Sequence, residues 1–242
     1  ALEISYPLTI LFNASLSTGK VPAMWKQAHI TPVFKNGDRS SVTNYRPIAL
    51  TSVLCKLLEG FVARAIQNHI DTYGPFNNQQ HGFSKGRSCV TLVNVLHSWQ
   101  SILDRPCSPR IDAVFLDLTK AFDKMPHHIL HSKLATNFNI RGSLWKWISY
   151  FLCNRTQNVL FLGHASSWSD VSSGVPQGSV LGPKIFNLFI NDISSVVSSH
   201  TALFADDMVL YRQIDSCEDE EQMQMDIDAL FCCLIRMECH ST

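Results

Sequence analysis

Two short apolar segments that close on a pair of aspartates constrain this sequence more than any other feature. Leu203–Ala205 and Met208–Tyr211 flank Asp206 and Asp207, and arms of this length around a polar turn predict a β-hairpin. The two carboxylates would lie at its tip. Aspartate also favours turns for its own backbone hydrogen bonds, so the pair alone fits either a plain turn or a functional site.

A third aspartate ends another short apolar run. Ala113–Leu116 precedes Asp117 and predicts a buried strand. If this strand and the hairpin belong to one sheet, Asp117 meets Asp206 and Asp207 at the edge of that sheet. Phosphoryl transfer to a nucleic-acid end needs two divalent cations roughly 4 Å apart, held by converging oxygen ligands. A lone strand-end aspartate is usually only a cap, so both interpretations stay open on spacing alone.

Helical periodicity and its boundary signals organise the rest of the chain. Helices are expected over six segments: from Val53 to the stop signal Gly74-Pro75, about Cys89–Leu103, from near Pro126, Leu144–Cys153, from Pro183 toward Val197, and behind the capping box Ser216-x-x-Asp219. Gln157–Leu162 and Ser167–Val171 predict a further hairpin. This mixture of strands and helices predicts an α+β fold.

Length and composition are those of an ordinary globular protein. The 242 residues, 45% of them hydrophobic, suit one large domain or two packed subdomains with a soft boundary near residue 105. No apolar run approaches the roughly 20 residues that cross a bilayer, and Glu3 stands where a secretory leader would be basic. We therefore expect an intracellular protein.

The eight cysteines include no C-x-x-C pair, which favours reduced thiols over a metal site.

The charge is balanced in total but uneven along the chain. A net charge of zero is unusual for a protein that binds phosphate backbones. Basic residues dominate the first hundred positions, whereas acids dominate the last forty. This distribution fits a basic nucleic-acid-binding half and an acidic metal-binding half, although a solvated charge run explains Glu218–Glu221 equally well.

Several ordered segments resemble the reverse transcriptases of non-LTR (LINE-type) retrotransposons, and the resemblance covers almost the whole chain. The matching segments are Asn44–Ile48 with Leu50 and Leu57–Glu59, Gln80–Phe83 with Lys85–Ser88, Phe115–Asp123 with Pro126-His127, Ser173–Pro183 and Phe204–Asp207. The separation of about 89 residues between Asp117 and Asp206 also suits this family.

The resemblance implies an α+β, right-hand polymerase fold whose antiparallel palm sheet is flanked by helices. Residues 1–104 would form the N-terminal segment and fingers, residues 105–242 the palm, and the thumb would be absent. The implied activity is RNA-directed DNA synthesis from deoxynucleoside triphosphates on an RNA template and a DNA primer, with two Mg²⁺ ions or Mn²⁺ in their place. Target-primed copying implies the nucleus, with the cytoplasm as the alternative, and no membrane is expected as a partner.

The same resemblance assigns the catalytic centre. Asp117, Asp206 and Asp207 would be the catalytic metal ligands, together with the backbone carbonyl of Leu118. Phe122 would lie beneath the sugar and clash with a 2′-hydroxyl, so that it selects deoxynucleotides. The alternative for Phe122 is an ordinary core phenylalanine.

Binding residues follow from the other matched segments. Lys35 and Arg46 would hold the triphosphate, since a guanidinium fork suits phosphate oxygens. Gln177 and Gly178 would contact the nucleotide and template. The template phosphates would be bound by two further cations, Lys85 and Arg87.

Some positions depart from the family pattern, and two alternatives to the polymerase activity stay open. Lys35 is followed by Asn36 instead of a second basic residue, and Met237–His240 differs from the usual letters. One alternative is a catalytically inactive remnant with at most weak nucleic-acid binding. Another is a viral RNA-dependent RNA polymerase, which Phe122 and the Pro-Gln-Gly loop disfavour.

Overall fold

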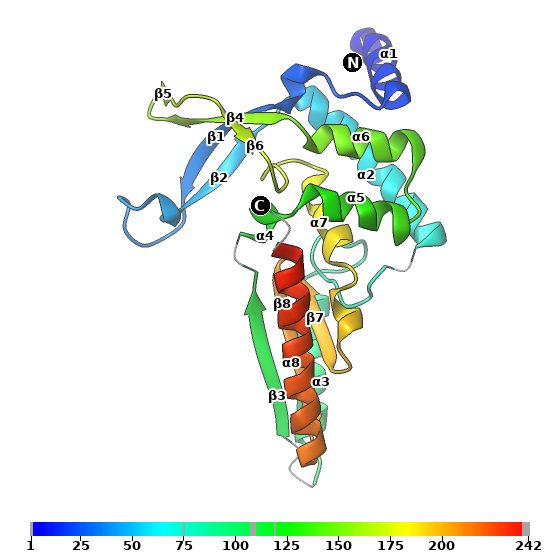
Figure 1. Cartoon of the computed structure of the whole chain (residues 1–242), viewed down its shortest axis with the longest axis vertical. Helices are drawn as coiled ribbons and strands as arrows, with labels where there is room; N and C mark the ends of the chain where they lie inside the picture. Colours follow the sequence, from blue (N-terminus) through cyan, green and yellow to red (C-terminus); the bar gives the residue numbers. More distant parts are fainter. Residues whose placement is uncertain (1, 75, 107–109, 119, 239–242) are drawn as a thin grey trace. The chain divides into compact units, whose positions relative to one another are not determined.

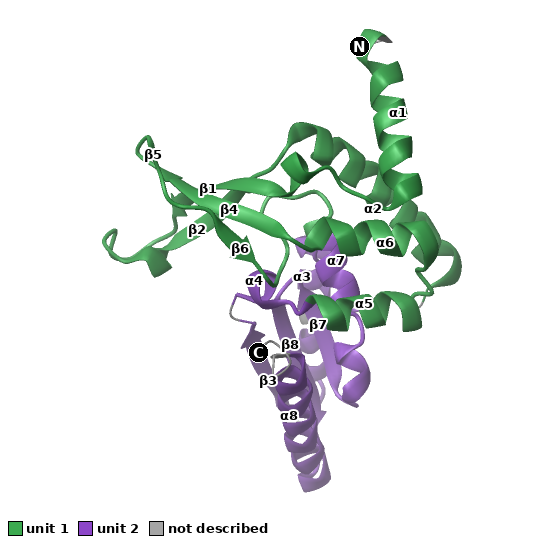
Figure 2. Cartoon of the chain, turned by 45° about the horizontal axis from the view of Figure 1, so that its top comes forward, with its two compact units in different colours: residues 1–75, 127–182 green, residues 76–126, 183–242 purple. Residues whose placement is uncertain are grey.

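The computed structural model describes residues 2–74, 76–106, 110–118 and 120–238. The chain forms two compact units, each built from two separate stretches (Figures 1 and 2). Unit 1 comprises residues 1–75 and 127–182, and unit 2 comprises residues 76–126 and 183–242. The boundaries between the two units do not fall near residue 105. The division into fingers and palm at that position stays a prediction. Pro75, Cys239 and His240, which the sequence analysis singled out, lie outside the described residues.

Unit 1 contains a five-stranded sheet in the order β2-β1-β4-β5, with β6 pairing with β4. Its strands are β1 (Gln27–Phe34), β2 (Tyr45–Leu50), β4 (Arg155–Phe161), β5 (His164–Ala165) and β6 (Ser169–Val171). The predicted hairpin is confirmed, because β4 is antiparallel to both β5 and β6. β4 also lies parallel to β1, a pairing between distant segments that no local pattern indicates.

The helices of unit 1 are α1 (Leu2–Thr18), α2 (Val53–Tyr73), α5 (His127–Thr136), α6 (Gly142–Leu152) and the 3-10 helices η1 (Ala23–Lys26) and η2 (Val42–Asn44). α2 ends where the N–H of Gly74 bonds to the carbonyl of Ile70, as the stop signal predicts. Its buried side chains recur at helical spacing: Cys55, Leu58, Glu59, Val62, Ile66 and Ile70. The large buried rings Trp147 and Phe151 of α6 stack with centroids 5.4 Å apart in the same unit.

Unit 2 is built on a three-stranded antiparallel sheet in the order β3-β8-β7. The strands are β3 (Arg110–Asp117), β7 (His200–Phe204) and β8 (Asp207–Ile214), and the helices are α3 (Cys89–Leu103), α4 (Ala121–Lys124), α7 (Gly182–Ile190), η3 (Ile193–Val196) and α8 (Cys217–Glu238). Tyr211 of β8 packs against Trp99 of α3, with ring centroids 5.0 Å apart. Its neighbour Arg212 pairs with Asp219 of α8 at 3.2 Å. Because successive side chains of a strand point to opposite faces, the two helices cover opposite faces of this sheet.

Two sequence predictions about unit 2 are wrong in detail. β3 is an edge strand instead of a buried one, and Phe115 on it is 70% exposed. α7 ends at Ile190 and does not run on toward Val197. The side-chain oxygen of the next residue, Asn191, accepts the backbone N–H of Asn77 at 2.8 Å, and the 3-10 helix η3 follows.

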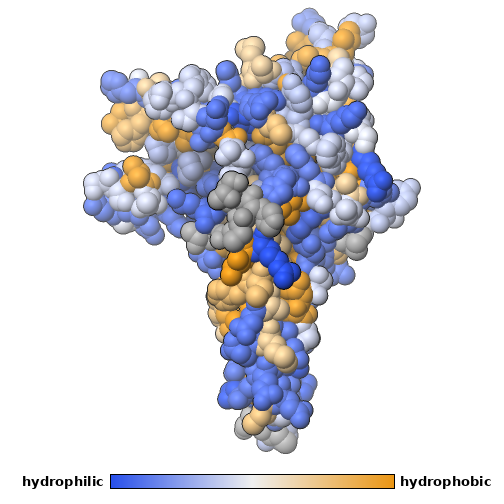
Figure 3. All heavy atoms as spheres, in the orientation of Figure 1, coloured by the Kyte–Doolittle hydropathy of each residue, from blue (hydrophilic) through white to orange (hydrophobic). Residues whose placement is uncertain are grey.

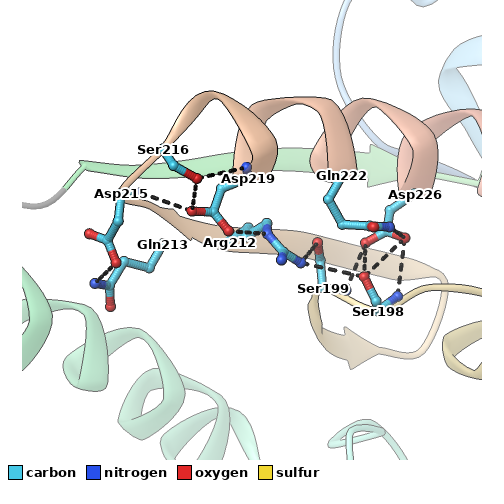
Figure 4. Close-up of polar contacts among 9 residues, drawn as sticks. All are labelled: Ser198, Ser199, Arg212, Gln213, Asp215, Ser216, Asp219, Gln222 and Asp226. Carbon is cyan, nitrogen blue, oxygen red and sulfur yellow. Dashed lines mark hydrogen bonds and ion pairs between the residues drawn. The ribbon is translucent and has the colours of Figure 1, made fainter.

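Polar side chains attach α8 to the sheet (Figure 4). The carboxylate of Asp226 accepts the backbone N–H groups of Ser198 and Ser199, which precede β7. The hydroxyl of Ser216 accepts the N–H of Asp219 and donates to its carboxylate, which confirms the predicted start of α8. The visible surface of α8 is largely hydrophilic along its first turns and more apolar toward its C-terminal end (Figure 3). No helix in the described ranges is both long and apolar enough to cross a membrane.

Candidate active site

Backbone register gathers the three aspartates at one end of the unit 2 sheet. Asp117 of β3 lies directly opposite Asp207 of β8. Phe204 also pairs with Asp207, so Ala205 and Asp206 form the two-residue turn between β7 and β8. Opposite residues of an antiparallel pair have Cβ atoms about 4.5–5.5 Å apart. The hairpin and its neighbouring strand therefore bring together acids that lie far apart in the sequence.

The donor chemistry of this cluster fits a divalent cation. Carboxylate oxygens are the hard ligands that Mg²⁺ prefers. The carbonyl of Leu118 accepts the N–H of Ala121 at 3.0 Å, and a carbonyl has a second lone pair for a further ligand. Within the described part of the chain, no group of three or more His, Cys, Asp or Glu side chains is arranged to hold a metal ion. The three acids are thus neighbours through backbone register and do not form a closed coordination set.

Phe122 lies in the short helix α4 of the same unit. Its ring stacks on that of Phe186 in α7, with centroids 4.3 Å apart and an interplanar angle of 25°. Phe186 is buried, whereas Phe122 is only half-buried. This packing fits both the predicted sugar contact and a core role, so the function of Phe122 stays a prediction.

Apart from Phe122, the residues expected to bind the nucleotide lie in unit 1. Arg46 of β2 is paired with Val33 of β1, and Lys35 follows β1 by one residue. Because β1 and β2 form an antiparallel pair, Lys35 and Arg46 lie on the same hairpin. Both cations are exposed.

The Pro-Gln-Gly loop is attached to the same hairpin. The carbonyl of Gln177 accepts the N–H of Ala49 in β2 at 2.7 Å. Gly178 has φ 110°, and a Cβ at this position would lie 3.0 Å from the carbonyl oxygen of Ala49. Glycine meets both demands, the left-handed backbone and the close approach.

Glu59 is a buried acid in this neighbourhood to which the sequence analysis gave no role. Its side chain is 0% exposed, and one carboxylate oxygen accepts the N–H groups of Val180 and Leu181 at 2.7 and 3.0 Å. Burial lowers the pKa of the nearby Arg155, while charge interactions with Cys55 and Glu59 raise it. The signal in the sequence was a single acid inside the apolar stripe of α2.

The two cations expected to bind the template lie in unit 2, in the loop before α3. Lys85 is exposed, and Arg87 donates to the side-chain oxygen of Asn78 at 3.3 Å. Burial, together with the charge of Arg87, lowers the pKa of His81. The structure places these residues on the surface, and their contact with a template stays a prediction.

Comparison with known proteins decides the family. Residues 33–239 match the family described as reverse transcriptase (RNA-dependent DNA polymerase). The chain belongs to this family. The enzymes of the family use divalent metal ions, consistent with the oxygen ligands described above.

Relatives from mobile elements confirm the predicted non-LTR type. The chain is 31% identical over 223 residues to a probable RNA-directed DNA polymerase from transposon BS of Drosophila melanogaster, covering 88% of this chain and 24% of that protein. It is 30% identical over 196 residues to the RNA-directed DNA polymerase from mobile element jockey of the same species, covering 77% of this chain and 20% of that protein. The chain thus spans about a quarter or less of the length of these curated relatives.

A solved structure confirms the α+β polymerase fold. The structure of apo telomerase from Candida tropicalis, truncated from its C-terminal domain, superposes with a TM-score of 0.64 and 12% identity. The match covers 98% of this chain and 53% of that chain. At this identity the likeness concerns the fold alone.

Proposed function

We propose that this reverse transcriptase chain catalyses RNA-directed DNA synthesis, in which a primer 3′-hydroxyl attacks the α-phosphate of a deoxynucleoside triphosphate and pyrophosphate leaves. The observation that carries the proposal is the register of Asp117 opposite Asp207, beside the turn that holds Asp206. Asp117, Asp206 and Asp207 would hold two Mg²⁺ ions with help from the carbonyl of Leu118. When bound, such ions activate the attacking hydroxyl and neutralise charge on the triphosphate.

The other proposed roles follow from charge and shape. Lys35 and Arg46 bind the triphosphate oxygens, and Phe122 excludes a 2′-hydroxyl. Gln177 and Gly178 line the nascent base pair. Two cations of unit 2 bind template phosphates, namely Lys85 and Arg87. The template is RNA and the primer is DNA, and because nuclear DNA is the expected target, the proposed site of action is the nucleus, with the cytoplasm as the alternative.

Primer extension tests the proposal. Purified chain is incubated with Mg²⁺, deoxynucleotides and a DNA primer on an RNA template, beside the double variant Asp206→Ala, Asp207→Ala. A matched control, Asp215→Ala with Asp228→Ala, removes two exposed acids from the same unit. We expect extension by the parent and the control, and a loss of at least about 10³-fold in the active-site variant. A folded parent that extends nothing would instead support the inactive remnant.

A further inference from the structure

The segment Gln79–Gly82 lies beside β7 like an additional strand. The N–H of His81 bonds to the carbonyl of Leu203, and the N–H of Leu203 bonds to the carbonyl of Gln79, each at 2.8 Å. These bonds form a parallel bridge between Gln80 and Leu203. The segment therefore adjoins the strand that leads into the aspartate turn, yet none of its side chains has a role in the proposed chemistry.

Gln80 contacts the turn itself. Its side chain is 2% exposed, and its amide nitrogen donates to the carbonyl of Ala205 at 3.2 Å. Its amide oxygen accepts the N–H of Ala205 at 3.0 Å and the N–H of Gly82 at 2.8 Å. One side chain thus binds both backbone polar groups of the residue that immediately precedes Asp206.

Gly82 permits this close approach. A Cβ on Gly82 would lie 2.4 Å from the nitrogen of Ala205, a distance at which backbone would have to shift. The carbonyl of Gly82 accepts the side-chain N–H of Asn187 in α7 at 2.8 Å. The segment is therefore held in place from α7 while it packs against the turn.

The turn needs such support because its backbone is strained. Ala205 has φ 57°, in the left-handed region that residues with a Cβ disfavour. Strained conformations persist where the surroundings over-determine them. The paired bonds from Gln80 supply that constraint at the residue whose conformation sets the direction of Asp206 and the start of β8.

We propose that Gln80 is a positioning residue that fixes the Ala205-Asp206 turn, so that the carboxylates of Asp206 and Asp207 are directed toward that of Asp117. The inference rests on the proposed polymerase function. A glutamine amide suits this place because it donates and accepts at once without charge. A glutamate would lose the donated bond and add a fourth negative charge near the three acids.

The test compares Gln80→Met, which keeps the length of the side chain and removes its hydrogen bonds, with Gln79→Met one residue away. The control removes only the bond between the side chains of Gln79 and Thr201, which lies outside the turn. Gly82→Ala adds a Cβ that would displace the backbone of Ala205 while Gln80 stays intact. It serves as a second variant should Gln80→Met fail to fold. Three quantities are measured on the purified chain: hydrogen exchange of residues 203–208, Mn²⁺ affinity by electron paramagnetic resonance, and kcat and KM in primer extension.

We expect Gln80→Met and Gly82→Ala to speed hydrogen exchange in the turn, to weaken Mn²⁺ binding and lower kcat by about 10- to 100-fold, and to leave KM for the primer–template within about twofold. Gln79→Met should resemble the parent. Faster exchange with unchanged Mn²⁺ affinity and kcat would reduce Gln80 to a structural residue and overturn the proposal. A parent that binds Mn²⁺ but extends no primer would contradict the polymerase function, while the exchange and Mn²⁺ measurements would still decide the role of Gln80.

Discussion

At the scale of single residues, buried polar side chains of this protein form hydrogen bonds with backbone groups of segments far away in the sequence. Glu59 is fully buried in α2, and its carboxylate accepts two backbone N–H groups just before α7. Buried polar groups that lose their partner leave an uncompensated desolvation cost. The stability of the Pro-Gln-Gly loop therefore depends on an acid more than a hundred positions upstream.

Replacing Glu59 with alanine should lower the free energy of unfolding by about 3 kcal/mol, because two buried N–H groups lose their acceptor and Arg155 loses a neighbouring negative charge. Urea denaturation followed by tryptophan fluorescence measures the change. The matched variant Glu221→Ala removes an exposed acid and should change stability by less than about 0.5 kcal/mol. Equal effects of the two substitutions would contradict the role assigned to Glu59.

Phe122 offers a second test at a single position. Phe122→Ala should raise incorporation of ribonucleotides relative to deoxynucleotides by about 10-fold or more, because the ring that would clash with a 2′-hydroxyl is removed. Phe122→Tyr keeps the ring and should retain the selectivity of the parent. Competitive single-nucleotide extension measures the ratio. An unchanged ratio in a folded alanine variant would leave Phe122 as a core residue stacked on Phe186.

At the scale of secondary-structure elements, α8 is secured to the unit 2 sheet by the carboxylate of Asp226. The side chain is 4% exposed and holds the turn before β7 through Ser198 and Ser199 (Figure 4). Burial tends to raise the pKa of Asp226, but hydrogen bonds from these two serines outweigh it, and the pKa is lowered. The folded state therefore binds the proton less readily than the unfolded chain does.

Asp226→Asn should cost about 2 kcal/mol of stability at neutral pH, since the charged acceptor is lost. The lowered pKa means that this contribution is present above the ordinary carboxyl pKa of about 3.9 and is lost as the pH falls through the folded-state value. Between about pH 5 and pH 2 the parent should therefore lose more stability than the variant. Denaturation series across this range check the difference, with the exposed Asp228→Asn on the same helix as the control. Parallel pH profiles for parent and Asp226→Asn would exclude this account.

At the scale of the whole molecule, the chain is electrically neutral and yet proposed to bind nucleic acid. In the first hundred positions nine basic residues stand against four acids, and the proposed template cations Lys85 and Arg87 belong to unit 2 with the three aspartates. The affinity for nucleic acid would then depend on the charge near the binding residues and not on the net charge of the chain. Binding through phosphates releases counterions and weakens as salt rises.

Replacing both Lys85 and Arg87 with alanine should reduce the slope of log affinity against log salt concentration by about 2, because each phosphate contact contributes about 0.9. Fluorescence anisotropy with an RNA–DNA duplex at several salt concentrations measures the slope. Lys20→Ala with Arg64→Ala removes the same charge from exposed positions of unit 1 and should change the slope little. If the two double variants behave alike, general charge and not a defined template contact explains binding.

Local signals in the sequence determined the elements and the family. The apolar repeat from Val53 to Gly74 and the serine at position 216 predicted α2 and the start of α8, because helix periodicity and capping act within a few residues. The letters around Asp117 and Asp206 identified the reverse transcriptase family, and the aspartate turn was predicted from its two apolar arms.

Pairings between distant segments were decided only by the tertiary structure. Three contacts join residues about 90 to 130 positions apart. They are the pairing of Asp117 with Asp207, the parallel pairing of β1 with β4 and the hydrogen bonds between Gln80 and Ala205. Strand periodicity indicates which face of a sheet a side chain occupies but not which strand lies beside it. For a glutamine in a loop, the neighbouring residues in the sequence do not indicate whether its side chain is buried. Such contacts depend on packing of the whole unit, which is why Phe115 proved exposed and Gln80 buried.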